Sequence, residues 1–189
     1  MSDKYKITKG EDAYFITFTI IEWLKVLEND EYKLIIVDSI HFCQMNKGLV
    51  VYGYCIMPNH VHMIIQGVDN YSVSEILRDL KRFTSRAIVK KLEEEKPEGY
   101  LLILNQFLEA GKSLKRIKKY KVWQDDNRAM VIFSNKFLYQ KLNYIHQNPV
   151  KYGLCQFPWE YTFSSAVNYA GNDGLIDVTL VSTELKIFK

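Results

Sequence analysis

The stretch from Tyr52 to Gln66, YGYCIMPNHVHMIIQ, decides the fold of this chain. Its apolar strand pattern is interrupted by Pro58 and Asn59 and then resumes around two histidines. A proline cannot donate to a β-ladder, so Pro58 belongs at a join between strands. We therefore expect residues 49–57 and 60–67 to pair as an antiparallel hairpin.

The two histidines, His60 and His62, are the strongest chemical signal in the sequence. Residues two apart in a strand project from the same face, so both imidazoles can converge on one ion. Val61 and Met63 then face a core on the other side, which leaves the histidines on the opposite surface. Histidines at this spacing also occur as hydrogen-bonded structural residues, so the spacing alone leaves both interpretations open.

The composition is that of an ordinary globular protein. The 189 residues are 48% hydrophobic and 25% charged, which fits a single domain over residues 1–189. No apolar run approaches the length that spans a bilayer, so we expect a soluble, cytoplasmic protein with no membrane partner. Cys43, Cys55 and Cys155 form no CxxC pair, which predicts small buried thiols and neither disulfides nor a structural zinc site.

Positive charge is unevenly distributed, although the formal net charge is only +3. Basic residues crowd the stretch 111–121, GKSLKRIKKYK, and a helix that we expect to open at Ser72 or Ser74 has a basic outer face. Both surfaces are candidates for phosphate contact, and Trp123 for base stacking; solvated surface charge and a core tryptophan are the alternatives. The candidate DNA-binding residues are Arg78, Lys81, Arg82, Lys115, Arg116, Lys118, Lys119 and Trp123.

A second part of the site is predicted in the segment 134–149, SNKFLYQKLNYIHQNP. It begins with good capping residues and ends at Pro149, which predicts a helix that stops there. Gln140, Tyr144 and Asn148 recur every four residues and so share one polar face. Such a face suits a phenol held beside a metal that takes an oxygen ligand from the same helix, although half-buried tyrosines at helix edges are common.

Two motifs, MPNHVH at 57–62 and KLNYIHQNPVKYGL at 141–154, resemble those of the REP-associated tyrosine transposases, which are single-tyrosine members of the HUH superfamily. The resemblance implies that Tyr144 is the nucleophile. It also implies that His60, His62 and Asn148 bind a divalent cation, Mg²⁺ or Mn²⁺.

The same resemblance implies a metal-dependent DNA transposase that cleaves and rejoins single-stranded DNA through a 5′-phosphotyrosine intermediate. The substrate would be a single strand with or without a folded hairpin, and whether the protein acts as a monomer or a homodimer is left open. One alternative is a protein of the same fold that binds DNA hairpins without cutting them. Another is a small metalloenzyme unrelated to DNA.

The fold class that we expect is α/β (α+β), a ferredoxin-like sandwich with helices packed on a central antiparallel sheet. The sheet would combine the strands 13–21, 49–57 and 60–67 with a late strand within 122–133. Residues 91–121 are interpreted as an insertion between core elements, with a short apolar helix at YLLILNQFLEA, residues 100–110.

Overall fold

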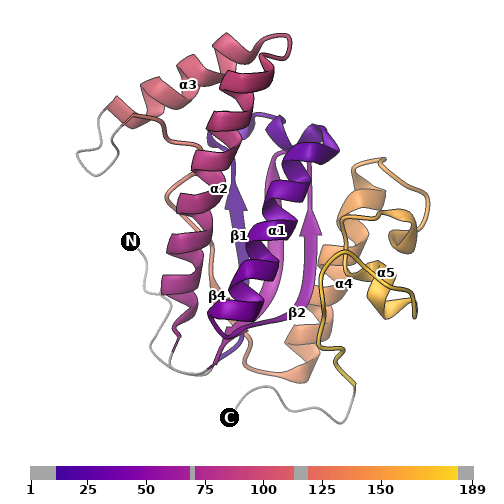
Figure 1. Ribbon diagram of the computed structural model, residues 1–189. Helices are drawn as coiled ribbons and strands as arrows, with labels where there is room; N and C mark the ends of the chain where they lie inside the picture. The colour runs from indigo at the N-terminus through magenta and orange to yellow at the C-terminus, as the bar shows by residue number, and fades with distance from the viewer. Residues whose placement is uncertain (1–11, 69–70, 113–118, 183–189) are drawn as a thin grey trace.

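The computed structural model describes residues 12–68, 71–112 and 119–182 (Figure 1). Within these ranges no helix has both the length and the apolar character needed to cross a membrane. The main elements are β1 (Tyr14–Thr19), α1 (Asp30–Asn46), β2 (Leu49–Ile56), β3 (His60–Gly67), α2 (Val73–Glu95), α3 (Tyr100–Lys112), β4 (Met130–Val131) and α4 (Asn135–Lys151). Short helices complete the chain: η2 (Ile21–Trp23), η3 (Val26–Glu28), η4 (Pro158–Glu160) and α5 (Ala166–Tyr169).

The four strands form one antiparallel sheet in the order β2-β3-β1-β4. Because α1 connects β1 to β2 and α2 leads from β3 toward β4, the core is the β-α-β-β-α-β arrangement of ferredoxin-like folds. The predicted α/β (α+β) sandwich is therefore confirmed. The expected apolar helix is α3, which turns away from the end of α2 (Figure 1).

The hairpin expected around Pro58 is present as β2 and β3, paired from Leu49 with Gly67 to Ile56 with Val61. The segment after β1 wraps around its turn. The carbonyl of Asn59 accepts a hydrogen bond from the N–H of Ile20, and that of Pro58 accepts one from Leu27, both at 2.9 Å. Backbone hydrogen bonds thus connect η2 and η3 to the turn that precedes the histidines.

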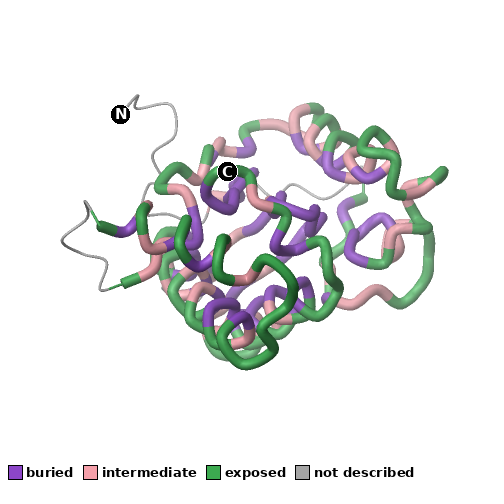
Figure 2. Tube along the Cα trace, turned by 90° about the horizontal axis from the view of Figure 1, so that it is seen from above, coloured by how far each residue is buried: buried purple, intermediate pink, exposed green. Residues whose placement is uncertain are grey.

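Helices cover both faces of the sheet, α1 and α2 on one and α4 on the other (Figure 1). Alternate strand residues point to opposite faces, so the strands contribute to two cores. Val61 and Met63 lie in the larger core with α1 and α2. Ile64 points into the smaller core, which Leu138 and Leu142 of α4 close. Buried positions accordingly follow the interior of these layers (Figure 2).

A glycine lets α4 pack closely on the sheet. β2 has an irregularity between Val51 and Gly53. A Cβ placed on Gly53 would lie only 2.6 Å from Cδ2 of Leu142, much closer than two carbons in van der Waals contact. Because Gly53 has no side chain, α4 can lie this close to the strands, together with the residues on its inner face.

α4 continues through the proline that was expected to end it. The Ser134 side chain caps its first turn by accepting a hydrogen bond from the N–H of Phe137 at 3.2 Å. Pro149 lies inside the helix, which ends at Lys151, so the predicted end was wrong by two residues. A proline in the last turn loses only its own bond to the Ile145 carbonyl, and its fixed φ suits a helix, so the helix is not broken.

Candidate functional site

His60 and His62 project from β3 toward the face that α4 covers. Their Nε2 atoms lie 3.0 Å apart, and their ring centroids 4.6 Å. His62 is buried, whereas His60 is partly exposed. The strand pattern predicted that the pair would lie on an open surface. It does not, because α4 packs over that face of the sheet.

One hydrogen bond to each Nδ1 atom orients the two imidazoles. Oδ1 of Asn59 lies 2.6 Å from Nδ1 of His60, and Oγ1 of Thr17 lies 2.7 Å from Nδ1 of His62. An amide oxygen can only accept, so His60 donates through Nδ1 and keeps a lone pair on Nε2. The Thr17 hydroxyl can accept from His62 in the same way, which leaves both Nε2 lone pairs available at one point.

Burial keeps both imidazoles neutral. It lowers the pKa of His60 to about 4, with a smaller contribution from the positive charge of Arg128. It also lowers the pKa of His62 to about 3, with further contributions from His60, Lys141 and Arg128. At neutral pH both side chains are therefore in the form that binds metal ions.

Tyr144 brings a phenol from α4 to this pair. Its ring centroid lies 5.2 Å from that of His62, and its ring meets Phe15 edge-on at 6.0 Å. The side chain is 41% exposed, so one part of it contacts the histidine while another part faces solvent. Two segments more than eighty positions apart in the sequence thus meet within one chain.

Asn148 lies one helical turn beyond Tyr144 and is partly buried. Its Nδ2 donates to the carbonyl of Tyr144 at 3.0 Å. Its amide oxygen has no hydrogen-bond partner among the described residues. No hydrogen bond joins Asn148 to either histidine in the same part of the chain, so the predicted third ligand contacts the backbone of Tyr144 and is not held against the pair.

The histidine pair fits a divalent cation. With metal–nitrogen bonds of about 2.1 Å, Nε2 atoms 3.0 Å apart subtend about 90° at an ion, the angle between neighbouring ligands of an octahedral ion. Among residues 12–68, 71–112 and 119–182, no three His, Cys, Asp or Glu side chains converge as a metal site. Asn148, the predicted third protein ligand, is of a residue type outside that set.

Three cationic side chains surround the same groups. Nζ of Lys141 lies 4.6 Å from the Phe15 ring centroid and 5.7 Å from that of Tyr144, and Nζ of Lys151 lies 6.0 Å from the latter. Arg128 is the third, since its charge contributes to the lowered pKa of both histidines. Within the described ranges none of the three forms an ion pair. The site consequently favours an anion.

Trp123 does not stack on a base as a DNA-binding candidate would, and the alternative of a core tryptophan is what the structure shows. The side chain is 4% exposed. Its Nε1–H donates to Oγ1 of Thr84 at 3.0 Å, and its ring packs edge-on against Phe18 at 4.8 Å. The indole therefore fills the core between the sheet and α2, where no base can reach it.

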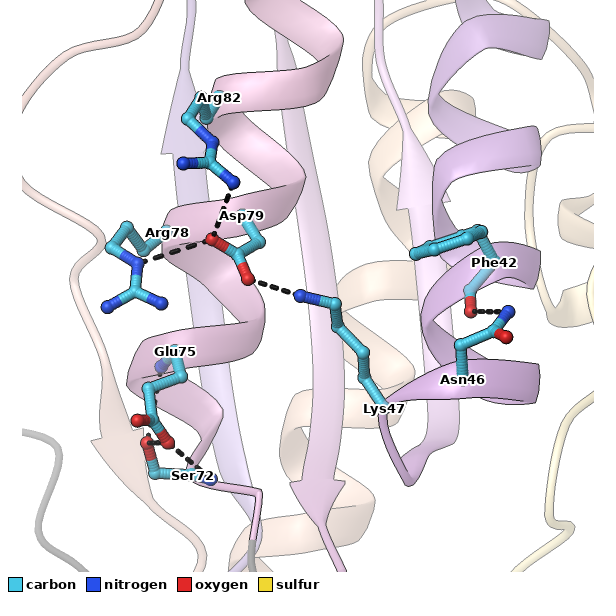
Figure 3. Close-up of polar contacts among 8 residues, drawn as sticks. All are labelled: Phe42, Asn46, Lys47, Ser72, Glu75, Arg78, Asp79 and Arg82. Atoms are coloured by element: carbon cyan, nitrogen blue, oxygen red, sulfur yellow. Dashed lines mark hydrogen bonds and ion pairs between the residues drawn. The ribbon is translucent and has the colours of Figure 1, made fainter.

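Arg78 and Arg82 are exposed on α2, and both approach the carboxylate of Asp79 (Figure 3). Asp79 also pairs with Lys47, from the turn after α1. One acid thus partly neutralises this basic face. The exposed Lys119 lies 3.8 Å from a carboxylate oxygen of Glu93, whereas Lys115, Arg116 and Lys118 fall outside the described residues.

Lys81 has a structural contact. Its Nζ donates to the carbonyl of Gln124 at 2.7 Å and to Oδ1 of Asn127 at 2.8 Å, which ties α2 to the loop before β4. Together with Arg78 and Arg82 it lines a cleft of about 530 Å³. Because α2 and α4 cover opposite faces of the sheet, these three residues are not brought together with the histidines and Tyr144.

Sequence reasoning missed the residues that orient and charge the site. The sequence patterns gave no site role to Thr17, in the first strand, or to Asn59, beside Pro58, yet each bonds a histidine. The pairing of Thr17 with His62 in the β1–β3 register was the missing information. Lys141 could have been found from its position three residues before Tyr144, since residues at this spacing are neighbours on a helix.

The chain is similar to known transposases in sequence and in fold. Residues 13–102 match the family described as "Transposase IS200 like". A protein of Haemophilus influenzae, provisionally named a REP-associated tyrosine transposase, is 27% identical over 114 residues, which span 59% of this chain and 55% of that relative. The chain thus matches about half the length of that relative.

A solved structure has the same fold over the whole of both chains. It is a REP-associated tyrosine transposase bound to a REP hairpin, with a TM-score of 0.62 and 19% identity over 100% of each chain. The likeness concerns the fold, and the family match and the Haemophilus influenzae relative supply the sequence relationship. The resemblance noted in the two motifs is therefore confirmed: residues 13–102 match the IS200-like transposase family, and a relative in sequence and a relative in fold are both REP-associated tyrosine transposases.

Proposed function

We propose that this protein is a metal-dependent transposase that cleaves and rejoins single-stranded DNA through a 5′-phosphotyrosine intermediate. One observation carries the proposal: the phenol of Tyr144 lies beside His62, whose Nε2 is 3.0 Å from that of His60 in the same chain. A nucleophile and a ligand pair are together what phosphoryl transfer to a side chain requires.

Tyr144 acts as the nucleophile. Its hydroxyl oxygen forms a bond to the scissile phosphorus, and the bond from phosphorus to the 3′ oxygen breaks. The phenolic proton ends on that oxygen, so one product is a free 3′-hydroxyl and the other is a 5′-phosphate linked to the protein. One phosphodiester replaces another, so the reverse attack by a 3′-hydroxyl can rejoin the strand without an energy-rich cofactor.

His60 and His62 would hold Mg²⁺ or Mn²⁺, with the amide oxygen of Asn148 as the third protein ligand. A cation bound there would polarise the phosphate and help to orient it for in-line attack. Thr17 and Asn59 keep the two imidazoles turned toward it.

The surrounding cations bind and orient the phosphate. Lys141 lies against the faces of Phe15 and Tyr144, where burial lowers its pKa and where its positive charge stabilises both a phosphate and a developing phenolate. Lys151 and Arg128 add charge on the more exposed side. Arg78 and Arg82 would contact the backbone of the same DNA elsewhere, in a manner that depends on salt and not on sequence.

The substrate proposed is a single strand with a folded hairpin beside the cleavage point. The support is the solved relative, which is bound to a REP hairpin. The unpaired part of the strand would enter between α4 and the start of β3, because His60, the first residue of β3, is the more exposed member of the pair.

Covalent adduct formation tests the proposal. A hairpin-bearing single strand of random sequence, labelled at its 3′ end because the tyrosine retains that part, is incubated with the protein and Mn²⁺ and separated under denaturing conditions. We expect a labelled protein band that disappears with a chelator and in Tyr144→Phe. Tyr152→Phe is the matched control, since Tyr152 is at the end of the same helix and is 44% exposed.

Two results would contradict the proposal. An adduct that persists in Tyr144→Phe would assign the nucleophile elsewhere. Hairpin binding that is independent of metal and sensitive to salt, without any adduct, would instead indicate a protein that binds DNA without cutting it.

A further inference from the structure

We propose that Trp23 is the binding site for one unpaired nucleobase, next to the histidine pair. The inference rests on the proposed function, because that base would belong to the strand whose phosphate Tyr144 attacks. Such a subsite determines where along the strand the phosphate comes to rest.

Trp23 combines exposure with closeness to the site. Its side chain is 50% exposed, although tryptophan is among the residues with most apolar surface to bury. Its ring centroid lies 6.1 Å from that of His60, with the rings at 71°. It has no parallel stacking partner among the described residues, so a flat ligand can lie on the indole.

The other two tryptophans are differently placed. Trp123 is buried and its N–H is hydrogen-bonded. Trp159 is exposed, but its ring is stacked on Phe157 at 5.0 Å and 5°. Trp23 is therefore the exposed tryptophan whose ring contact is with a residue of the catalytic pair.

The backbone holds the indole in place. Glu22 and Trp23 have φ values of 51° and 56°, in the left-handed region that side chains other than glycine rarely adopt. Nδ2 of Asn59 donates to the carbonyl of Trp23 at 3.3 Å, while Oδ1 of the same Asn59 accepts from His60. One side chain thus positions both the indole and the imidazole, so a base on Trp23 would be fixed relative to the phosphate at His60.

The rings follow one another in the order Trp23, His60, His62 and Tyr144, with centroid separations of 6.1, 4.6 and 5.2 Å. The indole and the phenol therefore flank the ligand pair. A strand whose phosphate lies at the pair has the attacking oxygen on one side and an aromatic surface on the other. Stacking on an aromatic side chain accepts every base, so the subsite fits single-stranded DNA and excludes paired bases, whose faces are covered.

Binding to a normal and an abasic strand tests this inference separately from cleavage. All variants carry Tyr144→Phe, so no covalent product forms. Fluorescence anisotropy compares a labelled 20-nucleotide strand of random sequence with a strand of equal length made of abasic residues. Trp23→Gly removes the indole and tolerates the left-handed backbone, Trp23→Phe keeps an aromatic ring, and Trp159→Ala is the control at a second exposed tryptophan.

We expect Trp23→Gly to bind the random strand roughly tenfold more weakly, the effect of losing one stacked base. Its affinity for the abasic strand should equal that of the parent protein, which retains Trp23. Trp23→Phe should lie close to the parent protein, and Trp159→Ala should equal it. Thermal unfolding confirms that each variant is folded.

Three outcomes would overturn the inference. Unchanged binding of the random strand in Trp23→Gly would mean that no base rests there. An equal loss for both strands would mean that Trp23 acts through the loop and not through stacking. If the parent protein binds neither strand, the proposed function fails along with this subsite, whereas the first two outcomes leave the proposed function intact.

Discussion

At the scale of single residues, the hydrogen bonds to Nδ1 of His60 and His62 orient the two imidazole rings. Asn59 and Thr17 make these bonds at 2.6 and 2.7 Å, and without them each imidazole could turn or change tautomer. Residues in this position around metal sites affect affinity strongly although they touch no metal.

Thr17→Val should weaken Mn²⁺ binding about 10- to 100-fold, because valine has a similar shape and cannot accept the bond from His62. Titration calorimetry with Mn²⁺ measures the change. Thr19→Val is the control, since Thr19 is a buried threonine on the same strand that pairs with His60 in register. Among the described residues its side chain makes no hydrogen bond to a histidine. Equal Mn²⁺ affinity in Thr17→Val and the parent would show that the hydroxyl does not orient His62.

The sequence predicted which residues share a face, and the family resemblance supplied their proposed roles. Local periods of two and four put His60 with His62 and Tyr144 with Asn148, and such periods survive folding because they belong to a single strand or helix. Burial of a tryptophan depends on its neighbours in space, so the sequence left Trp123 as a candidate either for base stacking or for the core, where it lies, while the exposed Trp23 went unnoticed. Positive φ at Trp23 has no signal in a segment without glycine.

At the scale of elements, the fit of α4 on β2 decides where the phenol lies. Gly53 opposes Leu142, which precedes Tyr144 by two residues. The hairpin was predictable because Pro58 punctuates two apolar runs, and β3 has the predicted bounds. The end of α4 was not predictable. A proline in the last turn destabilises a helix only slightly when the residues after it also have helical contacts.

Gly53→Ala should destabilise the protein by about 1–2 kcal/mol, because the added methyl group overpacks a filled core. Urea unfolding measures the free-energy change. In the Leu142→Val background the same substitution should cost less, since the shorter side chain makes room. Costs that simply add would show that the Gly53–Leu142 contact does not limit the approach of α4.

At the scale of the whole molecule, the chain is a sandwich that buries neutral histidines on the α4 side of its sheet. Besides His60 and His62, His146 has Nε2 2.9 Å from Oγ of Ser165, and burial lowers its pKa to about 4. In the unfolded chain the His146 imidazole becomes protonated as the pH falls through about 6.5, whereas in the folded chain it becomes protonated only at about pH 4. Stability is therefore complete above about pH 6.5 and falls as the pH drops through this window.

The free energy of unfolding should fall by about 2 kcal/mol between pH 7.5 and pH 5 because of His146 alone. Urea titrations at both pH values measure it. His146→Gln cannot titrate, so its stability should fall by that much less over the same interval. A parallel loss in parent and variant would place the acid sensitivity in other groups.

Identification of the residue that carries DNA after reaction tests the central claim most directly. The adduct formed with Mn²⁺ is digested with nuclease and protease, and mass spectrometry locates the phosphorylated tyrosine among the 13 in the chain. The structure predicts the 5′-phosphate on Tyr144, beside the histidine pair. A phosphate on any other tyrosine, with Tyr144 unmodified, would contradict it.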